Sequence, residues 1–263
     1  MSAATGAIEP VATVAATDAV EAALAPLRLA RLRRLLGRVL HLCTLPRIRR
    51  RYDAFALEIV HGVPIVVLPG VLNPKLMRTG AFLASHLDGA GIAATAKVLD
   101  MGTGSGICAV FAARHAQRVV AVDISEAAVC CARTNALLNG VEERVAVLHG
   151  DLYAPLAGER FDLVLFNPPF LRGTAAGDLD RAWRSTDIAE RFAAGLADHL
   201  TPTGSAYVLL SSFGAARAFI DEFRRHGLAV AVIAQRSFVN ERLTLFRVRA
   251  PRRAGARAAG DAS

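Results

Sequence analysis

Residues 97–107 read KVLDMGTGSGI, and this short stretch decides the fold of the 263-residue chain. Its first five residues predict a buried strand, which runs into glycines at alternate positions, Gly102, Gly104 and Gly106, and then into a helix predicted over 105–116. Glycines let the backbone turn tightly and approach a ligand closely, at a helix N-terminus that offers unpaired N–H groups. The pattern therefore predicts a nucleotide-like ligand rather than an ordinary strand-to-helix turn.

The spacing of the glycines, and the acids around them, narrow the class of ligand. A dinucleotide-binding loop would carry its last glycine one position later, where this chain has Ile107. Alternate glycines after an acidic residue, here Asp100, fit a pocket for S-adenosylmethionine better. Asp123 ends the next predicted strand, where a carboxylate can accept from both ribose hydroxyls. Asp151 follows the third strand, where it can accept from an adenine amino group.

A fourth predicted strand, 161–166, leads into the sequence Asn167-Pro168-Pro169-Phe170. In a doubly wound sheet the chain reverses direction between its first and fourth strands, so the carboxyl ends of both flank one crevice. Asn167 is therefore expected to face the glycines. Because two prolines leave carbonyls that only accept, the Asn167 amide oxygen and a proline carbonyl can together hold both hydrogens of an –NH₂ group. Phe170 can stack on the planar group that carries this amine.

The rest of the chain repeats strand, turn and helix, which predicts an α/β fold with a doubly wound, mainly parallel sheet. The last two strands are joined without room for a crossover helix, so the final strand is predicted to be antiparallel. A helix and a β-hairpin precede this seven-stranded, Rossmann-like sheet. The strands are predicted over 97–101, 119–123, 145–149, 161–166, 206–210, 228–234 and 243–248, and the hairpin over 55–60 and 65–68.

Charge is distributed unevenly along the chain. The net charge is +8, but nine arginines lie within 28–51, which holds no acid, and three more lie in the tail after residue 251. Without these twelve arginines the remaining chain carries a net charge of −4. Apolar residues recur at helical spacing over 26–46, with arginines on the other side, which predicts a basic amphipathic helix. Its leucines can pack on the body with the arginines in solvent, or the helix can form a substrate lid or an RNA-facing arm.

Composition excludes several classes of protein. A hydrophobic content of 53% is too high for a disordered chain. No apolar run reaches the ~18 residues of a membrane span, and the Ala-rich opening lacks the basic segment of a signal peptide, so a cytoplasmic protein without a membrane partner is expected. The four cysteines have neither disulfide nor metal-ligand spacing, so no metal is expected.

With these motifs in place, residues of about 55–245 resemble class I S-adenosylmethionine-dependent methyltransferases. The sequence after the fourth strand is similar to that of the NPPY/F group (HemK-like, or methyltransferase small domain), which methylates planar or exocyclic nitrogens. Members include release-factor glutamine methyltransferases and ribosomal RNA guanine or adenine amino methyltransferases. Upstream, Asn73-Pro74 followed by Thr79 resembles a loop whose threonine lies near the cofactor, although Arg78 stands where the family has Asp.

The resemblance implies a set of site residues and a division of the chain. Together with composition and charge, it predicts a flexible N-terminus over 1–25, an extension over 26–90 that forms a lid or substrate region, an S-adenosylmethionine-binding methyltransferase domain over 91–250 and a flexible basic tail over 251–263. The catalytic group would be Asn167, Pro168, Pro169 and Phe170. The residues implied at the cofactor are Asp100, Gly102, Thr103, Gly104, Gly106, Asp123, Ile124, Asp151, Leu152, Asn167 and Thr79.

The chain is thus predicted to transfer a methyl group from S-adenosylmethionine to an amine or amide nitrogen. Among acceptors, a small metabolite or natural product ranks first, because the residues after Phe170 can line a pocket with the extension as a lid. A glutamine side chain of a protein partner follows, and an RNA base amine comes last, because 28–51 lacks the aromatic residues on which bases stack. A protein that binds the cofactor without transferring a methyl group is the alternative from another class.

Overall fold

The structure is a computed structural model that describes residues 16–25, 52, 54–156, 158–168, 187–212, 214–238 and 241–251. The basic helix predicted over 26–46, Pro169, Phe170, most of the loop that follows them, and the tail from residue 252 lie outside the described residues.

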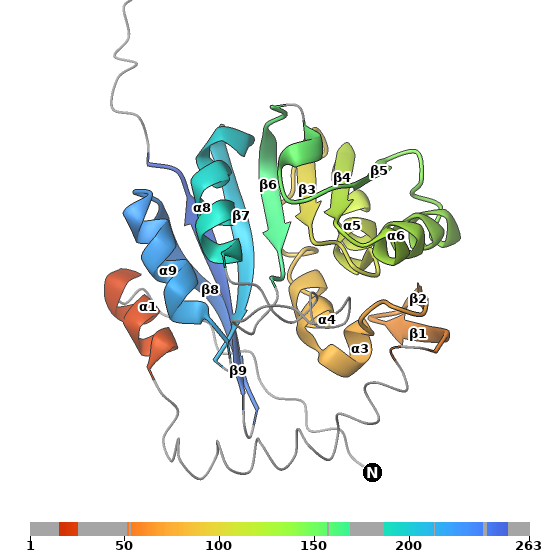
Figure 1. Cartoon of the computed structure of the whole chain (residues 1–263), viewed down its shortest axis with the longest axis horizontal. Helices are drawn as coiled ribbons and strands as arrows, with labels where there is room; N and C mark the ends of the chain where they lie inside the picture. The colour runs from red at the N-terminus through yellow and green to blue at the C-terminus, as the bar shows by residue number, and fades with distance from the viewer. Residues whose placement is uncertain are drawn as a thin grey trace, which may run out of the picture.

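A seven-stranded sheet with the strand order β5-β4-β3-β6-β7-β9-β8 forms the centre of the molecule (Figure 1). Strand β3 is parallel to β4 on one side and to β6 on the other, so the chain reverses direction at β3. Strand β9 is antiparallel to both β7 and β8. This arrangement confirms the predicted doubly wound sheet with an antiparallel last strand. Its strands are β3 (Lys97–Met101), β4 (Arg118–Asp123), β5 (Val145–His149), β6 (Phe161–Phe166), β7 (Leu200–Ser211), β8 (Ala229–Ser237) and β9 (Arg242–Arg249).

Helices cover both faces of the sheet, because the central strands are apolar on both sides. On β3, Val98 packs with the residues of α5 and α6, whereas Leu99 and Met101 pack with those of α8 and α9. The helices are α5 (Ile107–Ala113), α6 (Glu126–Leu138), α8 (Ile188–His199) and α9 (Ala216–Arg225), and a short 3-10 helix, η1 (Ala154–Leu156), follows β5.

Helix α5 begins two residues later than the sequence predicts. Its N-cap is Gly106, with a left-handed backbone (φ 77°). The glycine turn therefore includes Ser105 and Gly106, which the sequence assigns to the helix. Helix α6 begins as predicted, with the Ser125 hydroxyl accepting a hydrogen bond from the backbone N–H of Ala128 at 3.4 Å. The difference at α5 arises because left-handed glycine extends the turn into positions that the apolar pattern assigns to the helix.

Residues 16–24 form a helix, α1 (Ala16–Leu24), where the sequence favours a flexible terminus. Val20 and Ala23 are buried in the cluster of apolar residues shared with α8 and α9. Glu21 binds Arg217 and Arg224 of α9 at 3.0 and 2.9 Å, and Figure 1 shows α1 beside α9. Because α1 is stabilised by contacts with segments far away in the sequence, the local pattern of residues 16–24 does not reveal this helix.

The hairpin and two short helices before the sheet share the core of α5 and α6. The predicted hairpin consists of β1 (Ala56–Val60) and β2 (Val63–Val67), so β2 begins two residues earlier than predicted, and α3 (Pro74–Met77) and α4 (Thr79–Ala84) follow it. Asn135 of α6, which is completely buried, joins the hairpin to the glycine turn. Its amide nitrogen donates to the carbonyl oxygens of Val66 (2.6 Å) and Ser105 (2.8 Å), and its oxygen accepts from the Val66 N–H (2.7 Å).

Candidate functional site

The glycines after β3 have left-handed backbones but different surroundings. At Gly104 (φ 55°) an added Cβ would have no atom within 4 Å, so this glycine leaves open space above the turn. At Gly106 a Cβ would lie 2.8 Å from the Cα atom of Ala132, so this glycine lets α5 pack closely on α6. Of the two, only Gly104 leaves room for a ligand to approach its Cα atom.

Three backbone N–H groups of the turn donate hydrogen bonds to other groups of the protein. The N–H of Thr103 donates to the Val122 oxygen at 3.0 Å, and that of Gly106 donates to the Thr103 oxygen at 2.9 Å. The N–H of Gly104 donates to Oδ2 of Asp123 at 2.8 Å. A pyrophosphate group would need such N–H groups unpaired. These three N–H groups are therefore not available to a pyrophosphate, which agrees with the prediction that the ligand is not a dinucleotide.

Asp100 supports the turn from below. Its Oδ2 accepts from the Thr103 hydroxyl at 2.6 Å and from the N–H of Ala109 in α5 at 3.0 Å. Burial raises the pKa of this carboxyl to about 7, although both hydrogen bonds act to lower the pKa. A cationic ligand above the turn would favour the ionised form, and S-adenosylmethionine carries such charge at its sulfonium and ammonium groups.

Asp123 ends β4 beside the turn, and Ile124 follows it. Besides the bond from Gly104, the Asp123 carboxylate accepts from the Ser125 N–H through Oδ1 at 2.9 Å, and burial raises its pKa. Each oxygen has a further lone pair for a ribose hydroxyl. Ile124 is 51% exposed, which is unusual for a side chain of this size, and it offers an apolar surface next to the carboxylate.

The predicted adenine side of the site carries a residue that the sequence did not indicate. Arg191 of α8 donates to Oδ2 of Asp151 at 2.6 Å. This arginine follows a segment with no motif, and only the tertiary fold brings it to the end of β5. Leu152, the next residue, is buried and has a left-handed backbone (φ 49°).

Asn167 directly follows β6 and faces the start of α4. Its Nδ2 donates to the hydroxyl oxygen of Thr79 at 3.1 Å. Its Oδ1 is buried and has no hydrogen-bond partner among the residues that the structure describes. Pro168, also buried, follows it. An unpaired buried acceptor costs about 1–3 kcal/mol, so a donor that reached this atom would be stabilising.

The predicted residues that the structure describes thus gather at the carboxyl edge of the sheet. Thr79, the glycine turn, Asp123 and Asn167 come from α4 and from the ends of β3, β4 and β6, which the strand order places next to each other. Figure 1 shows α4 at the end toward which the arrow of β6 points. Pro169 and Phe170 belong to the part of the chain outside the description.

A surface groove of about 460 Å³ lies elsewhere, on the outer side of α6. None of the predicted site residues lines it, but His149, which ends β5 and lies 2.9 Å from the Ile124 carbonyl oxygen through Nε2, places one end of the groove beside Ile124. Its lining residues are Glu126, Val129, Cys130, Arg133, Thr134, Leu137 and His149.

A doubly wound sheet with a glycine turn after its first parallel strand, a carboxylate ending the second and Asn-Pro after the fourth defines a class I methyltransferase dependent on S-adenosylmethionine. The profile of the Methyltransferase small domain family matches residues 62–236, more than half of the chain. The chain belongs to this family. The residues at the turn and at Asp123 fit its cofactor, S-adenosylmethionine.

Curated relatives include methyltransferases of a ribosomal protein, of ribosomal RNA and of release factors. One is a ribosomal protein uL3 glutamine methyltransferase from Bradyrhizobium diazoefficiens, 34% identical over 185 residues, which are 62% of this chain and 57% of that protein. Another is a ribosomal RNA small subunit methyltransferase C from Alcanivorax borkumensis, 35% identical over 145 residues, covering 55% and 41%. The chain spans about half the length of these relatives.

Solved structures show the same fold. A 16S rRNA N2 methyltransferase from T. thermophilus, in complex with AdoMet and guanosine, superposes with a TM-score of 0.54 at 24% identity. The alignment covers 73% of this chain and 49% of that one. In the part of the chain that the structure describes, the helices are too short or too polar to cross a bilayer.

Proposed function

We propose that this chain methylates the nitrogen of a planar –NH₂ group in a component of the translation machinery, with a glutamine carboxamide of a protein as the acceptor. The observation that carries the proposal is the unpaired Oδ1 of Asn167, buried at the edge of the sheet next to the glycine turn. A buried acceptor of this kind is matched by an N–H donor of the substrate.

The residues after β6 are chemically suited to such a nitrogen. Pro168 and Pro169 lack N–H groups, so the peptide units of the Asn167 and Pro168 carbonyls offer an acceptor and no donor. Asn167 Oδ1 and the Pro168 carbonyl can each accept one hydrogen of the –NH₂ group. Holding both hydrogens fixes the plane of the group and stabilises the positive charge that develops on nitrogen during the reaction.

The cofactor supplies an electrophilic methyl group: the N–C bond forms as the C–S bond of the sulfonium breaks, sulfur keeps the electron pair, and the nitrogen then loses a proton to water. The chain's own residues position the partners. Asp123 would hold the ribose and Ile124 the adenine ring, while Asp100 and the glycine turn would carry the methionine part. Asp151 would hold the adenine amino group.

The relatives favour a macromolecular acceptor over the small metabolite that the sequence ranks first. The uL3 methyltransferase acts on glutamine and the small-subunit enzyme acts on ribosomal RNA. A glutamine carboxamide and a base amino group are both planar –NH₂ groups, so the geometry at Asn167 serves either. The uL3 relative aligns over the larger share of this chain, 62% against 55%, and this supports our choice of glutamine as the first candidate.

One observation favours RNA as a second candidate. Arg78 and Arg236 are exposed, and their guanidinium groups lie 4.9 and 5.3 Å from the ring centre of Phe238. Arg78 directly precedes Thr79, so this pair of cations lies near Asn167. This pair offers positive charge that phosphate groups would match.

The test is methyl transfer from isotope-labelled S-adenosylmethionine to ribosomes, ribosomal proteins, release factors and ribosomal RNA from cells that lack this gene. We expect label in protein, with a mass increase of about 14 on a glutamine-containing peptide. In Asn167→Ala we expect the turnover to fall about 100-fold or more, as on loss of one transition-state hydrogen bond.

Asn139→Ala is a matched control. The Asn139 side chain donates to Pro64 and Asn135 carbonyl oxygens, so its loss reports the effect of weakened packing alone. Label in RNA would replace the first candidate with the second. Full turnover in Asn167→Ala, or no label in any of these components, would refute the proposal.

A further inference from the structure

We propose that Thr79 is a positioning residue that holds the Asn167 side chain in the orientation seen in the structure, with Oδ1 directed toward the methyl acceptor. The inference rests on the proposed function, because it concerns the same asparagine. It assigns Thr79 a role different from the cofactor contact that the family resemblance implies.

An asparagine amide has two orientations that differ by exchange of its oxygen and nitrogen. In the structure Nδ2 donates to the Thr79 hydroxyl oxygen at 3.1 Å, which turns Oδ1 to the opposite side, where it is buried and unpaired. In the other orientation, Oδ1 would face Thr79 and Nδ2 would face the acceptor. The amide nitrogen of Asn167 and the –NH₂ group of the methyl acceptor would then both be donors, and no hydrogen bond could form between them.

Thr79 can fix this orientation because it is itself held firmly. It is buried, with 3% of its surface exposed, and it is the first residue of α4. Arg78 before it has a left-handed backbone (φ 62°), an uncommon conformation for a residue with a side chain. This residue ends α3 and begins α4, so the direction of Thr79 follows from how α3 is anchored.

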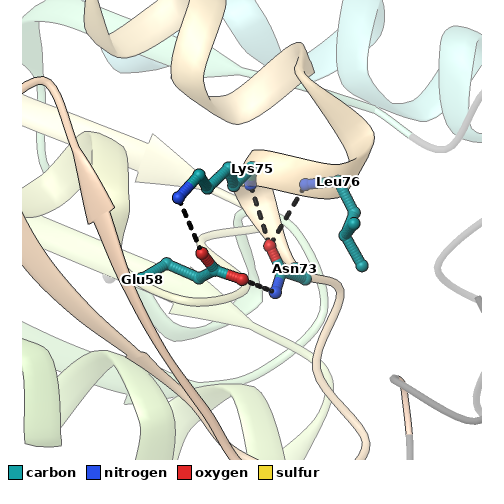
Figure 2. Close-up of polar contacts among 4 residues, drawn as sticks. All are labelled: Glu58, Asn73, Lys75 and Leu76. Atoms are coloured by element: carbon teal, nitrogen blue, oxygen red, sulfur yellow. Dashed lines mark hydrogen bonds and ion pairs between the residues drawn. The ribbon is translucent and has the colours of Figure 1, made fainter.

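A polar network anchors α3 to the hairpin, as Figure 2 shows. The Asn73 oxygen accepts from the backbone N–H groups of Lys75 and Leu76 at 3.0 and 3.1 Å and so caps the helix. The Asn73 amide nitrogen donates to Glu58 of β1 at 2.9 Å, and the Lys75 ammonium lies 3.1 Å from the other oxygen of Glu58. The Glu58 side chain is largely buried, with 14% exposed, so solvent screens these contacts only in part.

On its other side, α4 packs on the glycine turn. A Cβ added at Gly80 would lie 3.3 Å from Ile107, the first residue of α5, and 3.3 Å from Pro74. Leu83 of α4 is completely buried among the residues of α5. The hairpin and α5 therefore hold Thr79 from both sides, so the hydroxyl oxygen stays at a fixed position beside Asn167.

The experiment compares Thr79→Val, which removes the hydroxyl at nearly the same shape, with Thr79→Ser, which keeps it. Thr134→Val is the matched control, because the Thr134 hydroxyl donates to the Cys130 oxygen on α6, apart from the site. The first readout is the NMR spectrum of the Asn167 side-chain –NH₂ group in the full chain, assigned by its absence in Asn167→Ala.

The two amide protons of Asn167 are inequivalent in any environment, and we expect the hydrogen bond from one of them to Thr79 to enlarge their difference in chemical shift in the wild type. In Thr79→Val this difference should shrink, and in Thr79→Ser and Thr134→Val it should persist. In the methylation assay we expect kcat of Thr79→Val to fall about 10- to 100-fold, the effect of a misplaced group. The Kd of S-adenosylmethionine should stay unchanged, and Thr79→Ser should restore kcat.

The outcomes separate this inference from the proposed function. If the wild type methylates its acceptor but Thr79→Val keeps both kcat and the amide shifts, the positioning role is wrong and the function stands. If no acceptor is found, the amide shifts still decide. A Thr79→Val chain that loses cofactor binding and kcat together would return Thr79 to the cofactor site. If the valine methyl groups prevent folding, Thr79→Ala removes the same hydroxyl with less bulk.

Discussion

Substituting alanine for Gly106 is expected to destabilise the protein by packing as well as by backbone strain. A left-handed backbone costs an L-residue about 1–2 kcal/mol, and Gly106 has a φ of 77°. The new Cβ would also lie 2.8 Å from the Ala132 Cα and 3.0 Å from its Cβ, where α6 backbone cannot yield cheaply. Overpacking of this kind costs about 1–3 kcal/mol, so Gly106→Ala should lower the free energy of unfolding by about 2–5 kcal/mol.

Two other glycines separate the contribution of backbone strain from that of overpacking. Gly140→Ala has similar strain (φ 64°) but no atom within 4 Å of the Cβ, so only the backbone term of about 1–2 kcal/mol remains. Gly104→Ala should cost as little stability and yet weaken S-adenosylmethionine binding, because its Cβ enters the open space above the turn. Urea denaturation and titration calorimetry measure both quantities. Equal stability losses at Gly106 and Gly140, or unchanged cofactor affinity at Gly104, would refute the reasoning.

Three carboxylates of the site give further predictions. Because burial raises the pKa of Asp100 from 3.8 to about 7, the folded state holds its proton more tightly, and stability contributed by this group is lost as pH rises from about 4 to 7. The wild-type free energy of unfolding minus that of Asp100→Asn should therefore fall with pH, by at most about 1.4 kcal/mol per unit; a constant difference would contradict the raised pKa. In Asp123→Asn, an amide –NH₂ must face one of two backbone N–H groups, so stability should fall by about 1–3 kcal/mol and the cofactor Kd should rise; a Kd equal to that of the wild type would remove Asp123 from the site. Arg191→Ala should change stability by less than about 1 kcal/mol, because this arginine and Asp151 are both more than a third exposed; a larger loss in urea denaturation would show that the pair is structural.

The sequence predicts the centre of the site well, because parallel strands impose their own geometry. Gly104, Asp123 and Asn167 each follow a recognisable strand, and strands β3, β4 and β6 are neighbours in any doubly wound sheet that reverses at its first strand. Their convergence follows from topology and requires no knowledge of side-chain packing. The roles assigned to these residues remain predictions.

Contacts between distant segments could not be predicted in this way. Arg191 meets Asp151 across 40 positions, and Thr79 meets Asn167 across 88, with no pattern in the sequence between them. Helix α1 is stabilised by Glu21 and Val20 against elements near the C-terminus. The different tasks of Gly104 and Gly106 are likewise invisible in the motif, because they depend on the nearby α6 backbone.

The hydrogen bonds of Asn135 limit where the N-terminal region of this chain can be replaced by another. The side-chain amide of Asn135 joins β2 of the hairpin to Ser105 of the glycine turn, inside the core. A recombination that replaced the N-terminal region with a junction at residue 91 would leave the Asn135 oxygen, and one of its donor hydrogens, without partners in the interior. A junction before residue 55 would leave all three bonds intact. New acceptor-recognition modules can therefore be grafted upstream of the hairpin, whereas the hairpin itself must travel with the catalytic sheet.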